Sequence, residues 1–581
     1  MYFVSSSVVR WSVRGLFGQR ALGAGTLFLV ACLIIGCGQA TAADAQQRLV
    51  IGRVWTGVAA QPWAEAVAID GDRIAFVGSR VDAAAKLQPN APVIDAGDGL
   101  VVPGMIDAHI HLIDGGLHLT SVQLRDAATR EEFVKRIAEF AQRERRPGAW
   151  ITGGDWDHTV WGGEMPDREW IDAVTPETPV WISRLDGHMA LANSAAMRAA
   201  GVGDDVRDVA GGEIVRDAQG RPTGVFKDNA MSLIDRAAPP TSQGERLEAA
   251  VAAMAYLNAQ GVTAVHDMGT WRDLEVFRLA HKQGLLNVRV YSCTPLGQWE
   301  KLAAEVKRAG RGDEWLQIGG LKGYVDGSLG SHTAAFLAAF NDAPKDSGLL
   351  VNTVEDLEEW TAGADRAGLQ VAVHAIGDRA IRLQLDVFER VAQRNGDRDR
   401  RFRIEHSQHI DPADIPRYGK LGVIASMQPY HAIDDGRWAE RVIGARRSET
   451  SYAFRSLLDT GGRLAFGSDW YVAPATPLEG IDAAVNRRTL DGKHPDGWVP
   501  AQKISPSEAL QAYTSGGAYA AFREHDLGTL EAGKLADLVI LDRNIVEGNP
   551  NEIADARVDL TMAGGRIVYK RKNGENNEAR P

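Results

Sequence analysis

The sequence predicts an α/β protein whose main part is a (β/α)8 barrel. Three observations support this prediction. Helix-then-strand units repeat through the middle of the chain, chemically reactive side chains stand at the predicted strand ends, and short β-rich runs occupy both ends of the chain. Strands that alternate with helices form parallel βα units, and eight such units close into a barrel. At 581 residues the chain exceeds one compact core, so we expect two or three structural units.

The composition is that of an ordinary globular protein. Hydrophobic residues make up 45% of the chain and charged residues 24%, as in ordinary globular enzymes. The net charge of -12 comes from 76 acidic and 64 basic residues, without long runs of either sign. A nucleic-acid partner would need a basic face, so we expect none.

Residues 1–45 differ in composition from the remainder. Three arginines precede an uncharged apolar run at residues 21–36, which leads into Ile-Ile-Gly-Cys37. A basic region followed by an apolar run and small residues is typical of an export signal. Ile-Ile-Gly-Cys resembles a bacterial lipobox, which predicts a membrane-anchored lipoprotein lipidated at Cys37. Cleavage within residues 42–45 is the alternative and would give a soluble periplasmic or secreted protein; an uncleaved anchor would need a longer apolar run.

The cysteine count limits the kinds of metal site. Cys32, Cys37 and Cys293 are the three cysteines, and two of them lie in the export segment. Neither a disulfide framework nor a cysteine-based zinc site can be built from Cys293 alone. A bound metal would therefore need histidine, carboxylate or a modified side chain as ligands.

Short β-rich runs occupy residues 46–102 and return in residues 525–575. In the first of them, the turn Asp70-Gly-Asp72 joins two alternating runs, which is a strong hairpin signal. Each part is too small to bury a core of its own. We therefore expect one small β-sandwich assembled from both chain ends, with residues 103–524 inserted between its halves as the barrel.

The barrel strands are predicted by a repeated pattern. Helical stretches such as residues 246–260, rich in Ala and Leu, lead into short apolar runs. Eight such runs predict a TIM-like barrel. We expect the strands at residues 101–111, 261–267, 287–292, 316–322, 369–374, 402–406, 423–428 and 464–469.

One long stretch interrupts the repeat. Residues from about 115 to 242, between the first and second strands, carry far more chain than one helix requires. An insertion at the C-terminal face of a barrel can cover the active site as a cap. Trp156 and His188 of this segment are candidates for lining a substrate pocket. The alternative is that the aromatic residues of the insertion form its own core.

The first barrel strand ends in His109-Ile-His111. Residues two apart on a strand point to the same face, so both imidazoles aim at one position. Two neutral imidazoles make half of a divalent metal site, most often for zinc. The alternative is simply two polar residues at a strand end.

Similar side chains stand at the ends of several other predicted strands. Catalytic residues of such barrels come from the C-terminal ends of different strands. A single strand-end residue of this kind is more often structural, but six in register are hard to ascribe to chance. The six are His109, His111, Lys322, His374, His406 and Asp469.

These motifs, in this order, resemble the metal-dependent amidohydrolase superfamily. In detail they are similar to its amidohydrolase-3 family, which includes N-substituted formamide deformylase-like proteins. The resemblance covers residues from about 49 to 569. It is carried by Pro103-Gly-Met-Ile-Asp-Ala-His-Ile-His, Lys322-Gly-Tyr-Val-Asp-Gly-Ser-Leu-Gly, His374-Ala-Ile-Gly-Asp-Arg-Ala, Arg403-Ile-Glu-His, Gly467-Ser-Asp-Trp and Leu527-Gly-Thr-Leu-Glu-Ala-Gly-Lys.

The resemblance implies ligands for one or two divalent ions, with zinc as the expected metal. His109, His111 and Asp469 would hold one ion, and His374 with His406 a second. Asp469 would also be the catalytic base, because the resemblance places ligand and base at the end of the eighth strand.

The resemblance also implies a modified lysine. Lys322 would bridge the ions as a carbamate formed with carbon dioxide, because an ammonium group cannot ligate a cation. A salt bridge from Lys322 to Asp326 is the alternative. Lys227 in the insertion is a less favoured competitor for the role.

Residues near the predicted site are candidates for substrate binding. Arg379 and Gln428 follow strand ends, His409 lies in the loop after His406, and His332 lies in a Gly-rich loop after the fourth strand. Together with the two residues of the insertion, the candidates are Trp156, His188, His332, Arg379, His409 and Gln428.

The expected activity is metal-dependent hydrolysis of a non-peptide carbon–nitrogen bond in an amide, formamide or cyclic amide. A divalent ion lowers the pKa of bound water toward about 7, and Asp469 would move a proton from this water to the leaving amine. Two alternatives stay open. One is an exported ligand-binding lipoprotein on the same fold, and the other is the same metal site acting as an esterase, lactonase or deaminase.

Overall fold

The computed structural model describes residues 46–143 and 150–572. The export or lipoprotein signal expected at residues 1–45, with lipidation at Cys37, lies outside the described residues. Among the helices that are described, none combines the length and apolar character that a membrane crossing requires.

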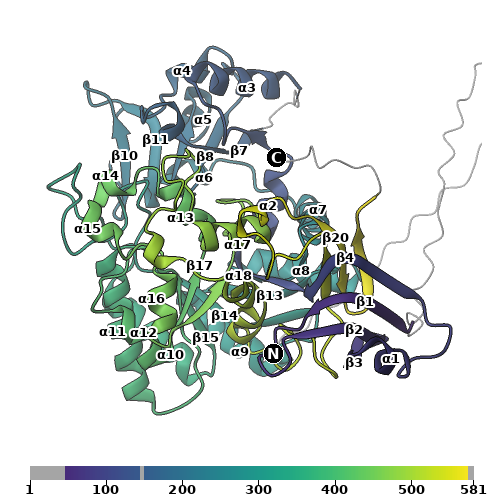
Figure 1. Cartoon of the computed structure of the whole chain (residues 1–581). Coiled ribbons are helices and arrows are strands. Elements are labelled where there is room, and N and C mark those ends of the chain that lie inside the picture. The colour runs from purple at the N-terminus through teal and green to yellow at the C-terminus, as the bar shows by residue number, and fades with distance from the viewer. Residues whose placement is uncertain (1–45, 144–149, 573–581) are drawn as a thin grey trace, which may run out of the picture. The chain divides into compact units, whose positions relative to one another are not determined.

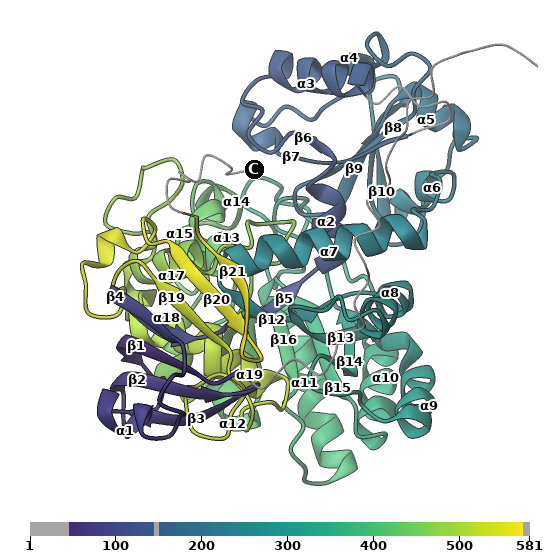
Figure 2. The same cartoon turned by 90° about the vertical axis from the view of Figure 1, so that its right-hand side faces the viewer.

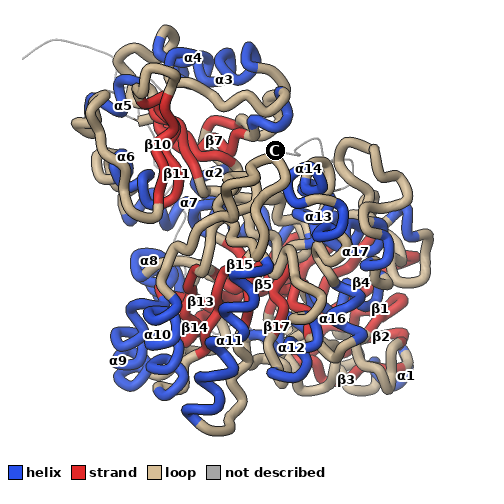
Figure 3. The backbone as a smooth tube through the Cα atoms, turned by 90° about the vertical axis from the view of Figure 1, so that its left-hand side faces the viewer, coloured by secondary structure: helices blue, strands red, loops and turns tan. Residues whose placement is uncertain are grey.

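Eight parallel strands form the central sheet, and each corresponds to one of the eight predicted from the sequence. Neighbouring strands follow one another in chain order, with β5 and β18 at the two ends of the sheet. Figure 3 shows these strands in red with helices packed outside them. The strands are β5 (Met105–Ile110), β12 (Val262–Asp267), β13 (Arg289–Pro295), β14 (Leu316–Tyr324), β15 (Gln370–Ala375), β16 (Arg403–His406), β17 (Ile424–Met427) and β18 (Arg463–Phe466).

Residues just beyond β18 close the sheet into a barrel. The Asp469 amide donates a hydrogen bond to the His109 carbonyl over 2.7 Å, and the His111 amide donates to the Trp470 carbonyl over 2.9 Å. Gly467 allows this close approach, because a Cβ there would lie 2.4 Å from the His109 nitrogen. The seam therefore joins the two segments that carry His109 and Asp469.

Helices cover the outside of the barrel and pack their apolar faces against it. Four of them begin with a side-chain cap, from Ser242, Thr270, Thr353 and Ser505, which satisfies backbone N–H groups of the first turn. In order, the helices are α7 (Gln243–Ala259), α8 (Trp271–Lys282), α9 (Trp299–Ala309), α10 (Val354–Arg366), α11 (Asp378–Asn395), α12 (Ile415–Leu421), α13 (Pro429–Asp435), α14 (Ala439–Ile443), α15 (Ala445–Ser448), α16 (Phe454–Asp459), α17 (Pro477–Asn486), α18 (Pro506–Gln511) and α19 (Gly517–Ala520).

Strands from both ends of the described chain share one seven-stranded sheet. Its order is β21-β20-β19-β4-β1-β2-β3, and antiparallel pairing of β19 with β4 joins the two ends. Figure 2 shows the purple N-terminal strands beside the yellow C-terminal ones. The predicted turn at Asp70–Asp72 connects β2 to β3, with Gly71 at a φ of +65°. The members are β1 (Arg48–Trp55), β2 (Trp63–Asp70), β3 (Arg73–Gly78), β4 (Val93–Pro103), β19 (Leu538–Leu541), β20 (Val558–Ala563) and β21 (Arg566–Lys570), with the short helix α1 (Arg80–Ala84) beside them.

The stretch between β5 and β12 contains a third sheet of its own, with the order β10-β11-β9-β8-β7-β6. Figure 1 shows it in blue at the top of the molecule. Phe133, Trp156 and Trp170 are buried together on one side of this sheet, so these aromatic residues form a local core. The elements are α2 (Leu112–His118), β6 (Val122–Gln123), α3 (Arg130–Arg143), β7 (Ile151–Trp156), α4 (Glu169–Asp172), β8 (Val180–Arg184), β9 (Met189–Ala192), α5 (Ser194–Ala199), β10 (Gly212–Arg216), β11 (Pro222–Asp228) and α6 (Ser232–Asp235).

Candidate active site

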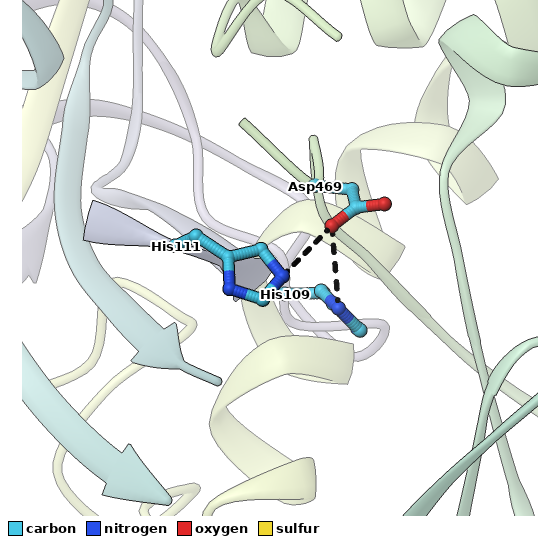
Figure 4. Close-up of side chains that lie close together, drawn as sticks. All are labelled: His109, His111 and Asp469. Carbon is cyan, nitrogen blue, oxygen red and sulfur yellow. Dashed lines mark ion pairs between the residues drawn. The ribbon is translucent and has the colours of Figure 1, made fainter. Parts of the chain in front are cut away.

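Two histidines from β5 meet one carboxylate from the segment after β18. His109 Nε2 lies 3.4 Å and His111 Nε2 lies 3.3 Å from Asp469 Oδ1 (Figure 4). His109 is the last but one residue of β5, and His111 follows the strand directly. The alternation of side chains along a strand therefore places both rings beside Asp469. Because a potential ligand atom of each residue lies within 4.8 Å of the other two, the three could hold one metal ion.

A second group of potential ligands shares Asp469. His406 Nδ1 lies 3.9 Å from Asp469 Oδ2, and His431 of α13 completes the group. The ligand atoms of His406, His431 and Asp469 also lie within 4.8 Å of one another. His431 is not among the site residues predicted from the sequence, because it lies three residues beyond the predicted seventh strand.

Lys322 enters the same cluster from β14. Its Nζ lies 3.0 Å from His109 Nε2, in a buried environment. The alternative salt bridge to Asp326 does not form, since Asp326 instead accepts backbone hydrogen bonds from Ala335, Ile376 and Gly377. Burial lowers the pKa of Lys322 to about 8, and the carboxylates around it counteract this effect only in part.

His374 stands at the end of β15 beside His406, with their ring centroids 4.4 Å apart. Its Nε2 lies 3.0 Å from the Gly327 carbonyl oxygen, which indicates a hydrogen bond donated by the ring. Within the described chain, His374 belongs to neither group of three close ligand atoms. Its ring nevertheless lines the same cavity as His406 and Asp469.

The electrostatics keep the imidazoles of His109, His374 and His406 neutral. Burial lowers the pKa of His109 to about 4, and burial with neighbouring positive charge holds the pKa values of His374 and His406 well below the usual range. Burial would raise the pKa of Asp469, but His109, His111 and His406 hold it below its ordinary value. Neutral imidazoles and an ionised carboxylate are the protonation states in which these groups bind divalent metals.

The backbone at two of these residues is strained. His406 has a φ of +74° and Asp469 a φ of +60°, in the left-handed region that side chains rarely occupy. His406 is the last residue of β16, and Asp469 lies three residues beyond β18. Such strain tends to be kept at functional sites, where the surrounding structure holds it in place.

The ligand clusters open into a cavity of about 510 Å³. The barrel side of its wall contains His111, Lys322, His374, His406 and Asp469. The opposite side comes from the stretch between β5 and β12, and it contains Arg184, Asp186, His188 and Asp228. A substrate of small-molecule size would thus contact both parts of the chain.

Comparison with known proteins assigns the family. A sequence model described as the amidohydrolase family matches residues 92–569, which is most of the chain. The chain belongs to the amidohydrolase family. The resemblance inferred from the motifs is thereby confirmed.

Individual relatives cover this amidohydrolase almost from end to end. Protein LONG AFTER FAR-RED 3 of Arabidopsis thaliana is 41% identical over 531 residues, covering 89% of this chain and 90% of that protein. N-substituted formamide deformylase of Arthrobacter pascens is 30% identical, covering 87% and 95% respectively. The solved structure of an uncharacterized metal-dependent hydrolase from Pyrococcus horikoshii OT3 is similar with a TM-score of 0.72 and 28% identity, covering 87% of this chain and 99% of that one.

Of the six candidate substrate-binding residues of this amidohydrolase, only His188 lines the cavity. His188 lines the cavity, with its Nδ1 2.8 Å from Asp228 Oδ1. Gln428 lies behind His406, where its Oε1 is 2.9 Å from the ring Nδ1. Like Gln428, the other four lie outside the cavity wall: Trp156 is buried in the insertion, His332 pairs with Asp342, His409 contacts Ser451, and Arg379 is the second residue of α11.

A buried pair of charged residues, Glu405 and Arg403, contacts the metal-ligand candidate His109. Glu405 Oε2 lies 2.5 Å from His109 Nδ1, and Arg403 Nε donates to Glu405 Oε1 over 2.7 Å. Both side chains are fully buried inside the barrel. The sequence carries a signal for them, because the alternation in Arg403-Ile-Glu-His puts two opposite charges on one face of a strand with no water-exposed side.

Proposed function

We propose that this amidohydrolase hydrolyses carbon–nitrogen bonds in small non-peptide amides, with N-substituted formamides as the first substrates to test. The observation that carries the proposal is the sharing of Asp469 by two pairs of histidines beside a cavity of small-molecule size. A 30% identical relative is an N-substituted formamide deformylase, which supports the choice of bond.

The residues present suit a divalent ion such as zinc. His109, His111 and Asp469 offer two imidazoles and one carboxylate, a donor set that catalytic zinc sites use. When bound there, the metal would supply activated water at neutral pH and polarise the scissile carbonyl. His406 and His374, at the adjacent strand ends, are the family-implied ligands of a second ion.

Asp469 has the position required of a proton carrier. It lines the cavity, is ionised, and stands beside the metal-binding imidazoles. In the proposed reaction its carboxylate accepts a proton from the attacking water and returns it to the nitrogen of the leaving amine. His188, opposite in the cavity wall, would orient the substrate through a hydrogen bond.

We include carboxylation of Lys322 in the proposal. Formation of a carbamate requires the neutral amine, and a pKa lowered to about 8 leaves a substantial neutral fraction near neutral pH. The resulting anion would lie beside His109 Nε2, which is 3.0 Å from the present Nζ. The lowered pKa predicts that carboxylation increases as the pH rises toward 8.

Metal removal tests the proposal. Protein stripped by a chelator should lose at least about 1,000-fold in the release of hexylamine from N-hexylformamide, because the activated water is gone. Zinc should restore the rate, and bicarbonate at pH 8 should speed the restoration through Lys322. His111→Ala should stay inactive under both conditions.

The matched control is His332→Ala, which removes a histidine outside the cavity and should respond to zinc as the wild type does. Full activity of completely metal-free protein would refute the metal-dependent mechanism. If zinc restored cleavage of hexyl formate or γ-butyrolactone but of no amide, the same site would instead belong to an esterase or lactonase. Tight substrate binding without any product would favour the ligand-binding alternative.

A further inference from the structure

The metal ligands that the family resemblance implies do not include His431, so they do not explain its position. It lies on α13, which begins directly after β17, and its side chain lines the cavity beside His406 and Asp469. The residue is only 8% exposed. Its ring is parallel to that of His406, at 5° between planes and 6.5 Å between centroids.

The ring of His431 has an unused nitrogen. Nδ1 lies 3.4 Å from Gln408 Nε2, while Nε2 is buried and has no hydrogen-bond partner among the described residues. Buried polar atoms in native proteins are almost always partnered, so an orphaned imidazole nitrogen calls for a missing ligand. An amide nitrogen only donates, so in this arrangement Nδ1 accepts from Gln408 and the neutral ring carries its proton on Nε2. Turning the Gln408 amide, so that Oε1 accepts from Nδ1–H, leaves the Nε2 lone pair for a cation.

The neighbours of His431 favour a cation as that ligand. Its ligand atom lies within 4.8 Å of those of His406 and Asp469, and these three form one of the two such groups in the described chain. Asp469 turns Oδ1 toward His109 and His111 and Oδ2 toward His406. His374, the family-implied partner of His406, is outside this group and has its Nε2 engaged by Gly327.

We propose that His431 is a further ligand of a second divalent ion, beside His406 and close to the Asp469 carboxylate. The inference rests on the proposed metal-dependent chemistry and deepens it by adding a ligand. The site then has imidazole donors from two neighbouring elements, β16 and α13, and imidazole is a common zinc ligand. His406, His431 and Asp469 line the cavity, where a substrate carbonyl could reach an ion held there.

Metal counting tests the proposal without any substrate. Full-length wild type and His431→Ala are stripped, loaded with excess zinc, passed through a desalting column, and analysed for zinc per chain by elemental mass spectrometry. Wild type should retain about two ions and His431→Ala about one, or should bind the second at least about tenfold more weakly. Cobalt substitution should show the same difference as the loss of one visible absorption component.

His409→Ala is the matched control. His409 is also a buried histidine with an unpartnered Nε2, but it contacts Ser451 and belongs to neither ligand group. This variant should keep both ions. His431→Gln, which keeps the side-chain volume and a polar group for Gln408, repeats the test if the alanine variant does not fold, as judged by circular dichroism.

Three outcomes would overturn the inference: both ions retained with unchanged affinity in folded His431 variants, a wild type that never takes up more than one ion, or equal zinc loss in His409→Ala. The result is independent of the proposed reaction. A protein that loses one ion through His431→Ala yet cleaves no amide keeps the metal assignment and refutes the amide substrate class.

Discussion

At the scale of single residues, Glu405 decides how His109 can act. The short contact of 2.5 Å between Glu405 Oε2 and His109 Nδ1 places the ring proton on Nδ1. His109 Nε2 is left as a lone-pair donor facing Lys322 and Asp469. Burial would raise the pKa of Glu405, but Arg403 and His109 hold it far below its usual range, so the carboxylate stays ionised.

Glu405→Gln should weaken zinc binding about 10- to 100-fold, because the carboxylate that orients a ligating histidine is lost. It should also lower the free energy of unfolding by roughly 3–5 kcal/mol, since the buried Arg403 loses its charge partner. Zinc affinity is measured by competition with a chelating dye. Glu524→Gln, which loses the half-exposed pair with Arg401, is the control and should bind zinc normally. Unchanged zinc affinity in Glu405→Gln would contradict a positioning role.

At the scale of elements, the seam between β5 and the end of β18 brings the first and last ligands together. Asp107 strengthens this seam, because its carboxylate accepts hydrogen bonds from the Ser468 amide at 2.9 Å and hydroxyl at 2.5 Å. Gly467 lies at the point of closest approach. A methyl group there would come within 2.8 Å of Asp107 Oδ1 and 2.4 Å of the His109 nitrogen.

Gly467→Ala should therefore force the two segments apart. We expect a loss of roughly 1–3 kcal/mol in the free energy of unfolding, as for overpacked cores, and weaker zinc binding because His109 and Asp469 separate. Denaturant unfolding and dye competition measure the two effects. Gly244→Ala, at an exposed position in the first turn of α7 with no atom closer than 4.0 Å, should be neutral or stabilising by up to about 1 kcal/mol. A Gly467→Ala protein as stable as Gly244→Ala would show that the seam tolerates a side chain.

At the scale of the whole molecule, the cavity is an acidic chamber between the barrel and the stretch from β5 to β12. Its two guanidinium groups are neutralised, since Arg184 pairs with Asp157 and Asp186, and Arg437 pairs with Asp434. Asp114 is exposed and has no hydrogen-bond or ion-pair partner in the described chain. Besides Asp469, the carboxylates in the wall are Asp114, Asp157, Asp186, Asp228, Asp235, Asp434 and Asp435.

The carboxylates that remain after this pairing predict a preference for cationic substrates. N-(5-aminopentyl)formamide, which carries an ammonium group where N-hexylformamide has a methyl, should have a kcat/KM at least about tenfold higher at low salt. Asp114→Asn should reduce that ratio mainly through KM, whereas Asp496→Asn, at an exposed position away from the cavity, should not. Equal kcat/KM values for the two formamides in wild type would show that the cavity does not select by charge.

The sequence by itself determined the eight barrel strands and which of their ends carry His109, His111, Lys322, His374, His406 and Asp469. It could do so because alternation along a strand and parallel strand order are local properties, and both place strand ends at one rim of a barrel. The tertiary structure alone decided that Glu405 contacts His109 across 296 positions in the sequence and that His431 reaches Asp469. It also placed Trp156 and His409 away from the cavity wall. These outcomes depend on which side chains meet across the closed barrel. Residues that meet there are far apart in the sequence, so no local sequence pattern predicts their contacts.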